Sequence, residues 1–167
     1  MFNKKKIFEL ECTIDRLNTI NKMYKKKEEL LIDSIKKLES INLNVLRSNI
    51  YVREDKIYLI TLKEEKNIFQ DIIIEIRDVL SEKKITELIA EYIECKGIHI
   101  SSIDTDYNYQ HIGHGSIAIQ MLIKYAKDKN VNRIFGGLLI SNDIGDLYRF
   151  YSSNGFDIKK TSFSMNL

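Results

Sequence analysis

Between a strand and a helix expected from the residue pattern, the chain reads Gln110-His111-Ile112-Gly113-His114-Gly115-Ser116. Two glycines one residue apart allow a sharp turn and leave several backbone N–H groups unobstructed. These donors point outward at the positive end of the helix dipole, where a phosphate or pyrophosphate binds readily. Ser116 is a candidate to cap the helix or to donate its hydroxyl to the same anion. The structural alternative is that both glycines only permit close packing of helix on strand.

The turn differs from two better-known phosphate-binding loops. No Gly-Lys-Ser/Thr follows it, so it is not a P-loop. The third glycine of the dinucleotide fingerprint is also absent, and the segments before the turn form a meander where that fold has its first βαβ unit. The turn therefore indicates an anion site of another kind.

Four segments before the turn are predicted to be strands, because apolar residues alternate in them or β-branched residues dominate. They are Ile57–Leu62, Asp71–Val79, Ile85–Cys95 and Ile98–Thr105. The third is ambiguous, since its apolar spacing also suits a helix, and a strand is favoured. After the turn we expect a helix, a strand, a second helix and a last strand or pair, at Ser116–Lys129, Arg133–Ile140, Asp146–Ser153 and Phe156–Leu167. This order predicts an α+β (α/β) fold with a mixed sheet flanked by helices.

The N-terminal part has a seven-residue apolar rhythm. Leucines and other apolar residues fall seven apart at Leu10, Leu17, Tyr24, Leu31, Leu38 and Val45, with Ile7, Ile14 and Ile35 between them. This a/d heptad pattern predicts a long amphipathic helix over residues 1–47, followed by a second domain over 48–167. Asn21, Glu28 and Asn42 interrupt the a positions. A break near Lys25–Lys27 would give a helical hairpin; the other two options are docking of the stripe on the domain itself and a homodimer through a coiled coil.

Composition excludes several classes of protein. The 26 basic and 24 acidic residues nearly balance, so no strong field for nucleic acid or membrane is expected. No secretory or membrane-spanning segment is recognisable. Cys12 and Cys95 form no spacing motif, which favours reduced thiols and a cytoplasmic protein. His111 and His114 are expected to be exposed loop residues, and no metal site is expected because no third ligand lies at suitable spacing.

Two ordered motifs together resemble the GNAT superfamily of acyl-CoA N-acyltransferases. Its signature Gln/Arg-x-x-Gly-x-Gly/Ala, after a buried strand and before a helix, matches Gln110, Gly113 and Gly115. Its Tyr-x-x-x-Gly-Phe element, at the end of an aromatic-rich helix, matches Tyr151-Ser152-Ser153-Asn154-Gly155-Phe156. One helix and one strand separate the two motifs, as in the family. The resemblance covers about Ile57 to Leu167 and implies a GNAT-like, mostly antiparallel mixed sheet.

The resemblance implies acetyl-CoA as co-substrate and assigns residues to it. Backbone groups of Ile103, Asp104 and Thr105 are expected to bind its acyl and pantetheine part. The amides of His111, Ile112, Gly113, His114, Gly115 and Ser116, beside Gln110, are expected to hold the pyrophosphate. Tyr151 stands where the family often places a general acid for the leaving thiolate; a core aromatic is the alternative. Ile144 replaces the family's asparagine seven residues before this tyrosine, and Asn142 is the candidate substitute.

The reaction that the resemblance implies is direct attack of a primary amine on the acyl thioester, which requires a base for the amine. Glu94 and Asp104 are the leading candidates, with Glu75 and His99 as further ones, and each also has a structural explanation. The family's first strand and two short helices are not recognisable, since the heptad helix occupies their place. A catalytically inactive GNAT-like protein that binds acyl-CoA or regulates, assembled through its N-terminal helix, is the alternative function.

Overall fold

The computed structural model describes residues 2–41, 45–65, 71–138 and 144–167 of the 167-residue chain. The chain divides into two compact units, Met1–Ile41 and Asn42–Leu167. None of the helices in these described ranges combines the length and the apolar character that a membrane span requires.

The first unit is a single helix, α1 (Phe2–Ile41), which runs without a break through Lys25–Lys27. The predicted long N-terminal helix is confirmed, and the helical hairpin is not formed. α1 ends at Ile41, so Val45, which the heptad pattern included, lies outside the helix and opens the first strand. Between Lys6 and Lys36, no side chain of α1 is buried.

The second unit contains an eight-stranded sheet in the order β1-β2-β3-β4-β5-β6-β8-β7. The strands are β1 (Val45–Arg53), β2 (Lys56–Glu65), β3 (Asp71–Asp78), β4 (Lys84–Ile93), β5 (Gly97–Thr105), β6 (Arg133–Gly137), β7 (Asp157–Lys159) and β8 (Ser162–Asn166). All neighbours run antiparallel except β5 and β6, which are parallel. The predicted mixed, mostly antiparallel sheet is therefore confirmed, and the ambiguous segment Ile85–Cys95 is a strand.

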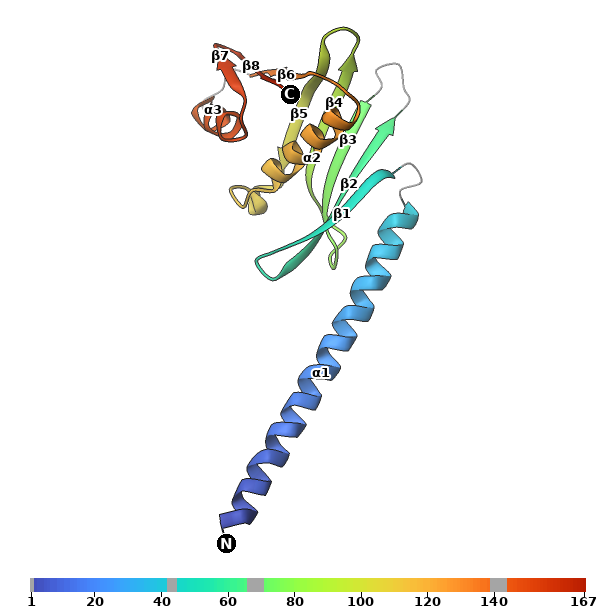
Figure 1. Ribbon diagram of the computed structural model, residues 1–167, viewed down its shortest axis with the longest axis vertical. Helices are drawn as coiled ribbons and strands as arrows, with labels where there is room; N and C mark the ends of the chain where they lie inside the picture. Colours follow the sequence, from blue (N-terminus) through green and yellow to red (C-terminus); the bar gives the residue numbers. More distant parts are fainter. Residues whose placement is uncertain (1, 42–44, 66–70, 139–143) are drawn as a thin grey trace. The chain divides into compact units, whose positions relative to one another are not determined.

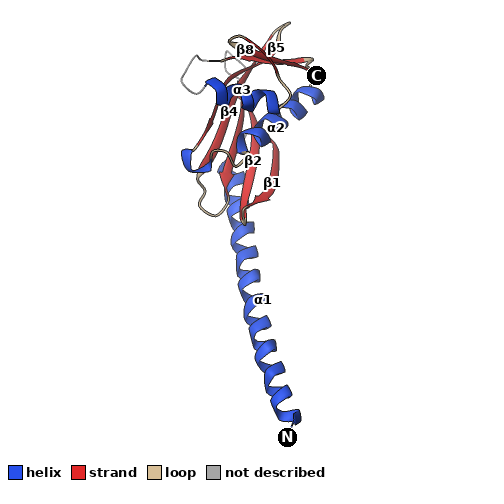
Figure 2. Ribbon diagram, turned by 90° about the vertical axis from the view of Figure 1, so that its left-hand side faces the viewer, coloured by secondary structure: helices blue, strands red, loops and turns tan. Residues whose placement is uncertain are grey.

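Two helices and a short 3-10 turn connect the later strands. They are η1 (Tyr107–Tyr109), α2 (His114–Asp128) and α3 (Ile144–Ser153). α2 packs against β3, β4 and β5 on one face of the sheet (Figure 1), and α3 contacts β7. Figure 2, coloured by secondary structure, shows the same sheet with α2 lying along it. α2 begins at His114, two residues before the predicted start at Ser116.

The core forms where the alternating side chains of the strands meet the apolar face of α2. On β3 the residues Ile72, Ile74 and Ile76 are almost fully buried, and α2 meets them with a face that includes Ile119 and Leu122. Burial of one such aliphatic side chain contributes roughly 1.5–3 kcal/mol, so this layer fixes the register of β3 under the helix. The rigid layer positions both ends of α2.

Strand β1 was not expected from the sequence. It pairs antiparallel with β2 across a two-residue turn, Glu54-Asp55, in which both residues have left-handed φ values of 49° and 60°. The expectation that the N-terminal helix takes the place of the first strand is wrong. The short turn also leaves no room for helices between β1 and β2. Because β1 spans residues 47 and 48, the division between helix and sheet lies before Val45.

Strands β5 and β6 separate after a short parallel pairing. Only Ile98–Ile100 pair with Ile134–Gly136. A side chain at Gly136 would collide with the ring of Phe163 on β8 and approach the Ile100 carbonyl to 3.0 Å. Within the described part of the chain, Ser102–Thr105 pair with β4 alone, and Ser101 lies at a register shift opposite Ile89 and Ala90 without a partner on β4 or β6. We call this point of separation the fork; beyond it β5 presents a free edge that leads to the glycine turn.

Candidate functional site

The glycine turn has the backbone geometry of an open anion cradle. His111 and Gly113 both have positive φ, at 60° and 91°. Gly113 is the N-cap of α2 and makes no side-chain cap, so the first turn of the helix is left open. The expectation that Ser116 caps the helix is wrong, because Ser116 lies inside the first helical turn.

The backbone amides of the turn donate to no backbone carbonyl among the described residues. In the described part of the chain, the first amide of α2 that donates to a backbone carbonyl is that of Ile117, which bonds to Gly113 O at 3.2 Å. The amides from His111 to Ser116 make no such bond there. The first N–H groups of a helix have no intrahelical partner and carry the positive end of the dipole. The turn therefore offers a group of donors suited to an anion.

Side chains tie this turn to the end of β5. Gln110 Nε2 donates to Thr105 O at 3.2 Å, which occupies that carbonyl. The Asp106 carboxylate accepts from Asn108 N at 3.0 Å and pairs with Lys83 Nζ at 2.8 Å. Hydrogen bonding to Lys83, followed by that to Asn108, lowers the pKa of Asp106 below its ordinary value. The free edge of β5 and the cradle are thus held as neighbours.

Arg53 is a residue of the site that the sequence did not reveal. It ends β1, and its Nη1 lies 2.9 Å from the position that a Cβ on Gly113 would take. Among the described residues, the guanidinium has no ion pair or hydrogen bond. A cation at a helix N-terminus is unfavourable for the protein alone, since it faces the positive end of the dipole. A bound anion would reverse the sign of this interaction.

His114 is buried, and the expectation of an exposed loop residue is wrong. The side chain is 1% exposed and lies among Tyr51, Tyr58 and Tyr109, with Nδ1 2.6 Å from Tyr51 Oη. Burial, followed by the charges of Arg53 and Lys56, lowers the pKa of His114. Burial also raises the pKa of Tyr51, so both groups are neutral and the pair fixes the first residue of α2 to β1. Within the described residues, His114 Nε2 has no hydrogen-bond partner.

The two sequence motifs are in direct contact. Asn154, in the second motif, donates through Nδ2 to Ser116 Oγ at 3.1 Å and to Phe150 O at 2.8 Å. A side chain on Gly115 would lie 3.2 Å from the ring of Phe150 and 3.5 Å from Ile103 Cδ1. Gly115 thus serves the close packing of helices, the structural alternative, whereas Gly113 serves the open turn.

Tyr151 lies beside the fork. Its ring stacks on Phe163 with centroids 3.7 Å apart, and Phe163 pairs with Gly136 at the fork. Burial raises the pKa of Tyr151 to about 12. Among the described residues, its hydroxyl has no hydrogen-bond partner. Tyr151 is therefore both a core aromatic and a protonated phenol at neutral pH.

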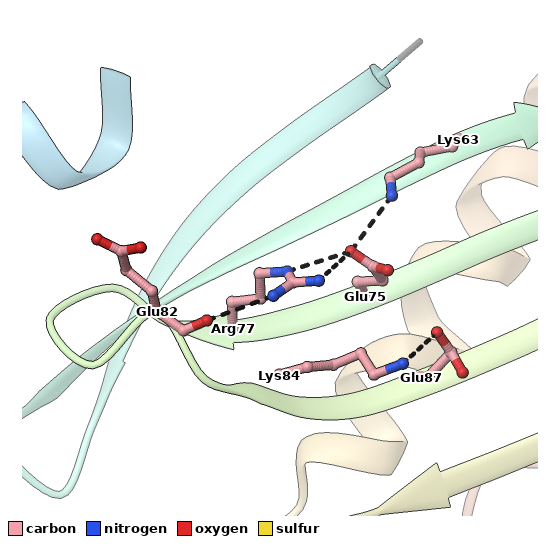
Figure 3. Close-up of polar contacts among 6 residues, drawn as sticks. All are labelled: Lys63, Glu75, Arg77, Glu82, Lys84 and Glu87. Carbon is pink, nitrogen blue, oxygen red and sulfur yellow. Dashed lines mark hydrogen bonds and ion pairs between the residues drawn. The ribbon is translucent and has the colours of Figure 1, made fainter. Parts of the chain in front are cut away.

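Glu75, one of the candidate bases, forms ion pairs with two cations. Its carboxylate is 3.3 Å from Lys63 Nζ and 3.2 Å from Arg77 Nη2, as Figure 3 shows, and the residue is 7% exposed. Burial opposes its charge, but Arg77 and Lys63 outweigh burial and lower the pKa of Glu75. His99 Nδ1 is likewise 3.0 Å from Glu91. Both residues have structural partners, which weakens their case as bases.

The two leading base candidates lie at opposite ends of one hairpin. Asp104 is an exposed residue of β5 on the free edge next to the turn. Glu94 is exposed in the connection between β4 and β5, beyond the pair Ile93 and Gly97. At about 3.3 Å per residue, the length of β5 separates Glu94 from the glycine turn by roughly 25 Å. The structure does not bring Glu94 to the cradle, and Asn142 lies outside the described residues.

Comparison with known proteins identifies the fold. No family model and no curated protein match the chain. Solved structures do match. A GNAT-family acetyltransferase of Staphylococcus aureus has 17% identity and a TM-score of 0.50, over 58% of this chain and 68% of that one. An IAA acetyltransferase of Bacillus cereus has 14% identity and a TM-score of 0.52, over 58% and 78%.

A third match was solved with ligand. It is a GNAT-family acetyltransferase of Elizabethkingia anophelis with acetyl-CoA bound, at 15% identity and a TM-score of 0.51, over 58% of this chain and 76% of that one. The sheet-containing part of the chain therefore has the GNAT fold, as the two motifs predicted. At this level of identity the likeness shows the fold alone.

Proposed function

We propose that the chain is an acetyl-CoA-dependent N-acetyltransferase that transfers an acetyl group to a primary amine. The proposal depends on one observation: the amides from His111 to Ser116, at the start of α2, have no backbone acceptor within the described ranges of the chain. The free edge of β5 leads directly to them. An extended ligand with an anionic tail fits a strand edge that ends in such a cradle.

The residues present suit acetyl-CoA. The amides from His111 to Ser116 would hold the pyrophosphate, and Gly113 leaves open the space that a Cβ would fill. Arg53 would supply a positive charge to the bound pyrophosphate. Ile103, whose backbone groups point to the free edge of β5, would bond the pantetheine arm. The backbone of Asp104 faces its partner Glu87 on β4, and the Thr105 carbonyl already accepts from Gln110. The bound co-substrate supplies an activated acyl thioester.

Residues near the fork would assist the acyl transfer. Backbone amides at the free edge of β5 would stabilise the developing oxyanion. Tyr151 would donate a hydrogen bond to the leaving thiolate. With a pKa of about 12 for the phenol against roughly 8.5 for a thiol, complete proton transfer is uphill by about 5 kcal/mol. Tyr151 would therefore act mainly by a hydrogen bond that strengthens as charge develops.

Asp104 is the base that we propose for the amine, ahead of Glu94. It lies on the free edge of β5, and no hydrogen bond or ion pair of its side chain is found among the described residues. A carboxylate at this place would take the proton of the amine directly or through a water. Glu94 lies at the far end of the hairpin and would need a long acceptor to serve the same role.

One observation favours the second candidate function, an acyl-CoA-binding protein without catalysis. Asp104 and Glu94 are exposed, whereas the buried carboxylate of Glu75 is occupied by Lys63 and Arg77. Turnover of acetyl-CoA on a panel of primary amines separates the two functions. Release of free thiol that depends on an amine supports the enzyme. Saturable acetyl-CoA binding without any release supports the binder, and failure to bind would reject both.

A further inference from the structure

Helix α1 carries an apolar stripe that it cannot cover by itself. Leu10, Ile14, Leu17 and Tyr24 follow one another along the heptad a and d positions, and each is more than half exposed. An a/d stripe is narrow and is shaped to receive the stripe of another helix. The stripe continues through Leu31 and Ile35, so it extends over most of the described side chains of α1.

The polar residues of the stripe decide against parallel pairing of two copies. In a parallel pair each a or d residue meets the same residue of the other copy. Glu28 would then face Glu28 inside the interface, and the lysine runs Lys25–Lys27 would lie at the same height. Two carboxylates brought together in a partly dry interface repel each other, and the adjacent lysines add a second like-charge contact.

Antiparallel pairing removes both conflicts. In that orientation a positions meet d positions of the other copy, and one register superimposes the two helices almost completely. Its layers are Leu10 with Ile35, Ile14 with Leu31, Leu17 with Glu28, and Asn21 with Tyr24, each present twice by symmetry. Glu28 and its symmetry mate are then 11 residues apart along the helix axis, or about 16 Å at 1.5 Å per residue.

The same register places the three lysines and Asn21 opposite suitable neighbours. The segment Lys25–Lys27 lies level with Asn18-Thr19-Ile20 of the other copy, which carries no charge. Asn21 meets Tyr24 in the two layers nearest the symmetry axis, where an amide and a phenol can share a hydrogen bond. A single buried polar pair of this kind also penalises shifted registers.

We infer that α1 is a self-association element that pairs with α1 of a second copy of this chain, antiparallel and in this register. The inference concerns only the N-terminal helix, so its test does not depend on whether the protein transfers acyl groups. A closed two-fold pair uses the stripe on both copies and leaves no part of it for a third chain.

Cysteine cross-linking of the full-length chain tests orientation and register together. In a background of Cys12→Ser and Cys95→Ser, Leu10→Cys alone should remain unlinked by a short bismaleimide. The Leu10→Cys, Ile35→Cys double variant should give a covalent dimer, since each cysteine faces its counterpart in the other copy. Sedimentation of the unmodified chain should show the dimer mass.

Three outcomes would overturn the inference. A covalent dimer from Leu10→Cys alone would show parallel pairing. A monomer mass at concentrations of about 100 μM, with no cross-link in the double variant, would show that another part of the chain or another protein covers the stripe. A dimer mass without the Leu10 to Ile35 cross-link, while circular dichroism shows the helix intact, would show a different register or interface.

Discussion

At the scale of single residues, the glycines of the sequence predict the turn, whereas contacts between residues far apart in sequence could not be predicted. Gly113 has a positive φ of 91° at the start of α2, as two glycines before a helix had indicated. The sequence pattern predicts an exposed His114, because no residue near it in sequence indicates the contact with Tyr51, which is 63 residues away. Arg53 was missed for the same reason. Local pattern predicts the turn, whereas only the folded sheet brings its supporting side chains together.

Replacement of Arg53 by glutamine should weaken acetyl-CoA binding. Loss of a charge-assisted hydrogen bond costs about 1.5–3 kcal/mol, which corresponds to roughly a 10- to 100-fold higher Kd. Calorimetric titration measures this, with Lys127→Gln as the matched control. Lys127 is an exposed cation in the last turn of α2, so its loss removes the same charge at the far end of the helix that the glycine turn opens. Equal affinities of the two variants would remove Arg53 from the site.

Protonation of His114 should destabilise the folded chain in mild acid. Its pKa is lowered in the folded state, chiefly by burial, so the unfolded chain binds a proton first as the pH falls below about 6.5. The stabilising contribution is present above that pH and is lost below it. Urea unfolding at pH 7.5 and 5.5 should show a larger loss for the wild type than for His114→Gln. Identical losses would mean that His114 titrates normally.

Tyr151→Phe separates packing from chemistry. The ring stack on Phe163 is retained, so we expect the free energy of unfolding to change by less than about 1 kcal/mol. Loss of the hydrogen bond that Tyr151 would donate to the leaving thiolate should lower kcat by about 100-fold, with KM nearly constant. Steady-state kinetics on an amine that serves as acceptor measures both parameters. An unchanged kcat would leave Tyr151 as a core aromatic only.

At the scale of elements, alternation and glycine spacing predicted β2 to β6 and both later helices to within a few residues. β1 was missed for a physical reason. Its turn, Glu54-Asp55, holds two residues with left-handed φ where asparagine and glycine are usual, so no hairpin signal is present. Val45 also continued the heptad count by coincidence. The fork at Gly136 could not be predicted from the sequence either, since it depends on a contact with Phe163 from another strand.

The fork should be sensitive to one added methyl group. Gly136→Ala forces a Cβ against the Phe163 ring and to 3.0 Å from the Ile100 carbonyl, so we expect a loss of about 3 kcal/mol of stability. Gly145→Ala is the matched control. Nothing lies within 4 Å of a Cβ at that position in α3, and alanine in place of a helical glycine should add about 0.5–1 kcal/mol. Chemical denaturation compares them; a tolerated Gly136→Ala would mean that the fork is loosely packed.

At the scale of the whole molecule, the chain joins a sheet with the GNAT fold to a helix that carries an apolar heptad stripe. The heptad pattern predicted the helix but left its partner open, because periodicity defines a stripe and not what covers it. A two-residue turn joins β1 to β2, so no helix between these strands can contribute to a substrate site.

Amide chemical shifts of the isotope-labelled full-length chain, followed while acetyl-CoA is added, test the central claim most directly. Amides of His111 to Ser116 and of the free edge of β5 should shift together and saturate, while those of the β4–β5 connection at Glu94 stay in place. Saturable binding that leaves the amides from His111 to Ser116 unmoved, or no shift anywhere at millimolar acetyl-CoA, would contradict the account.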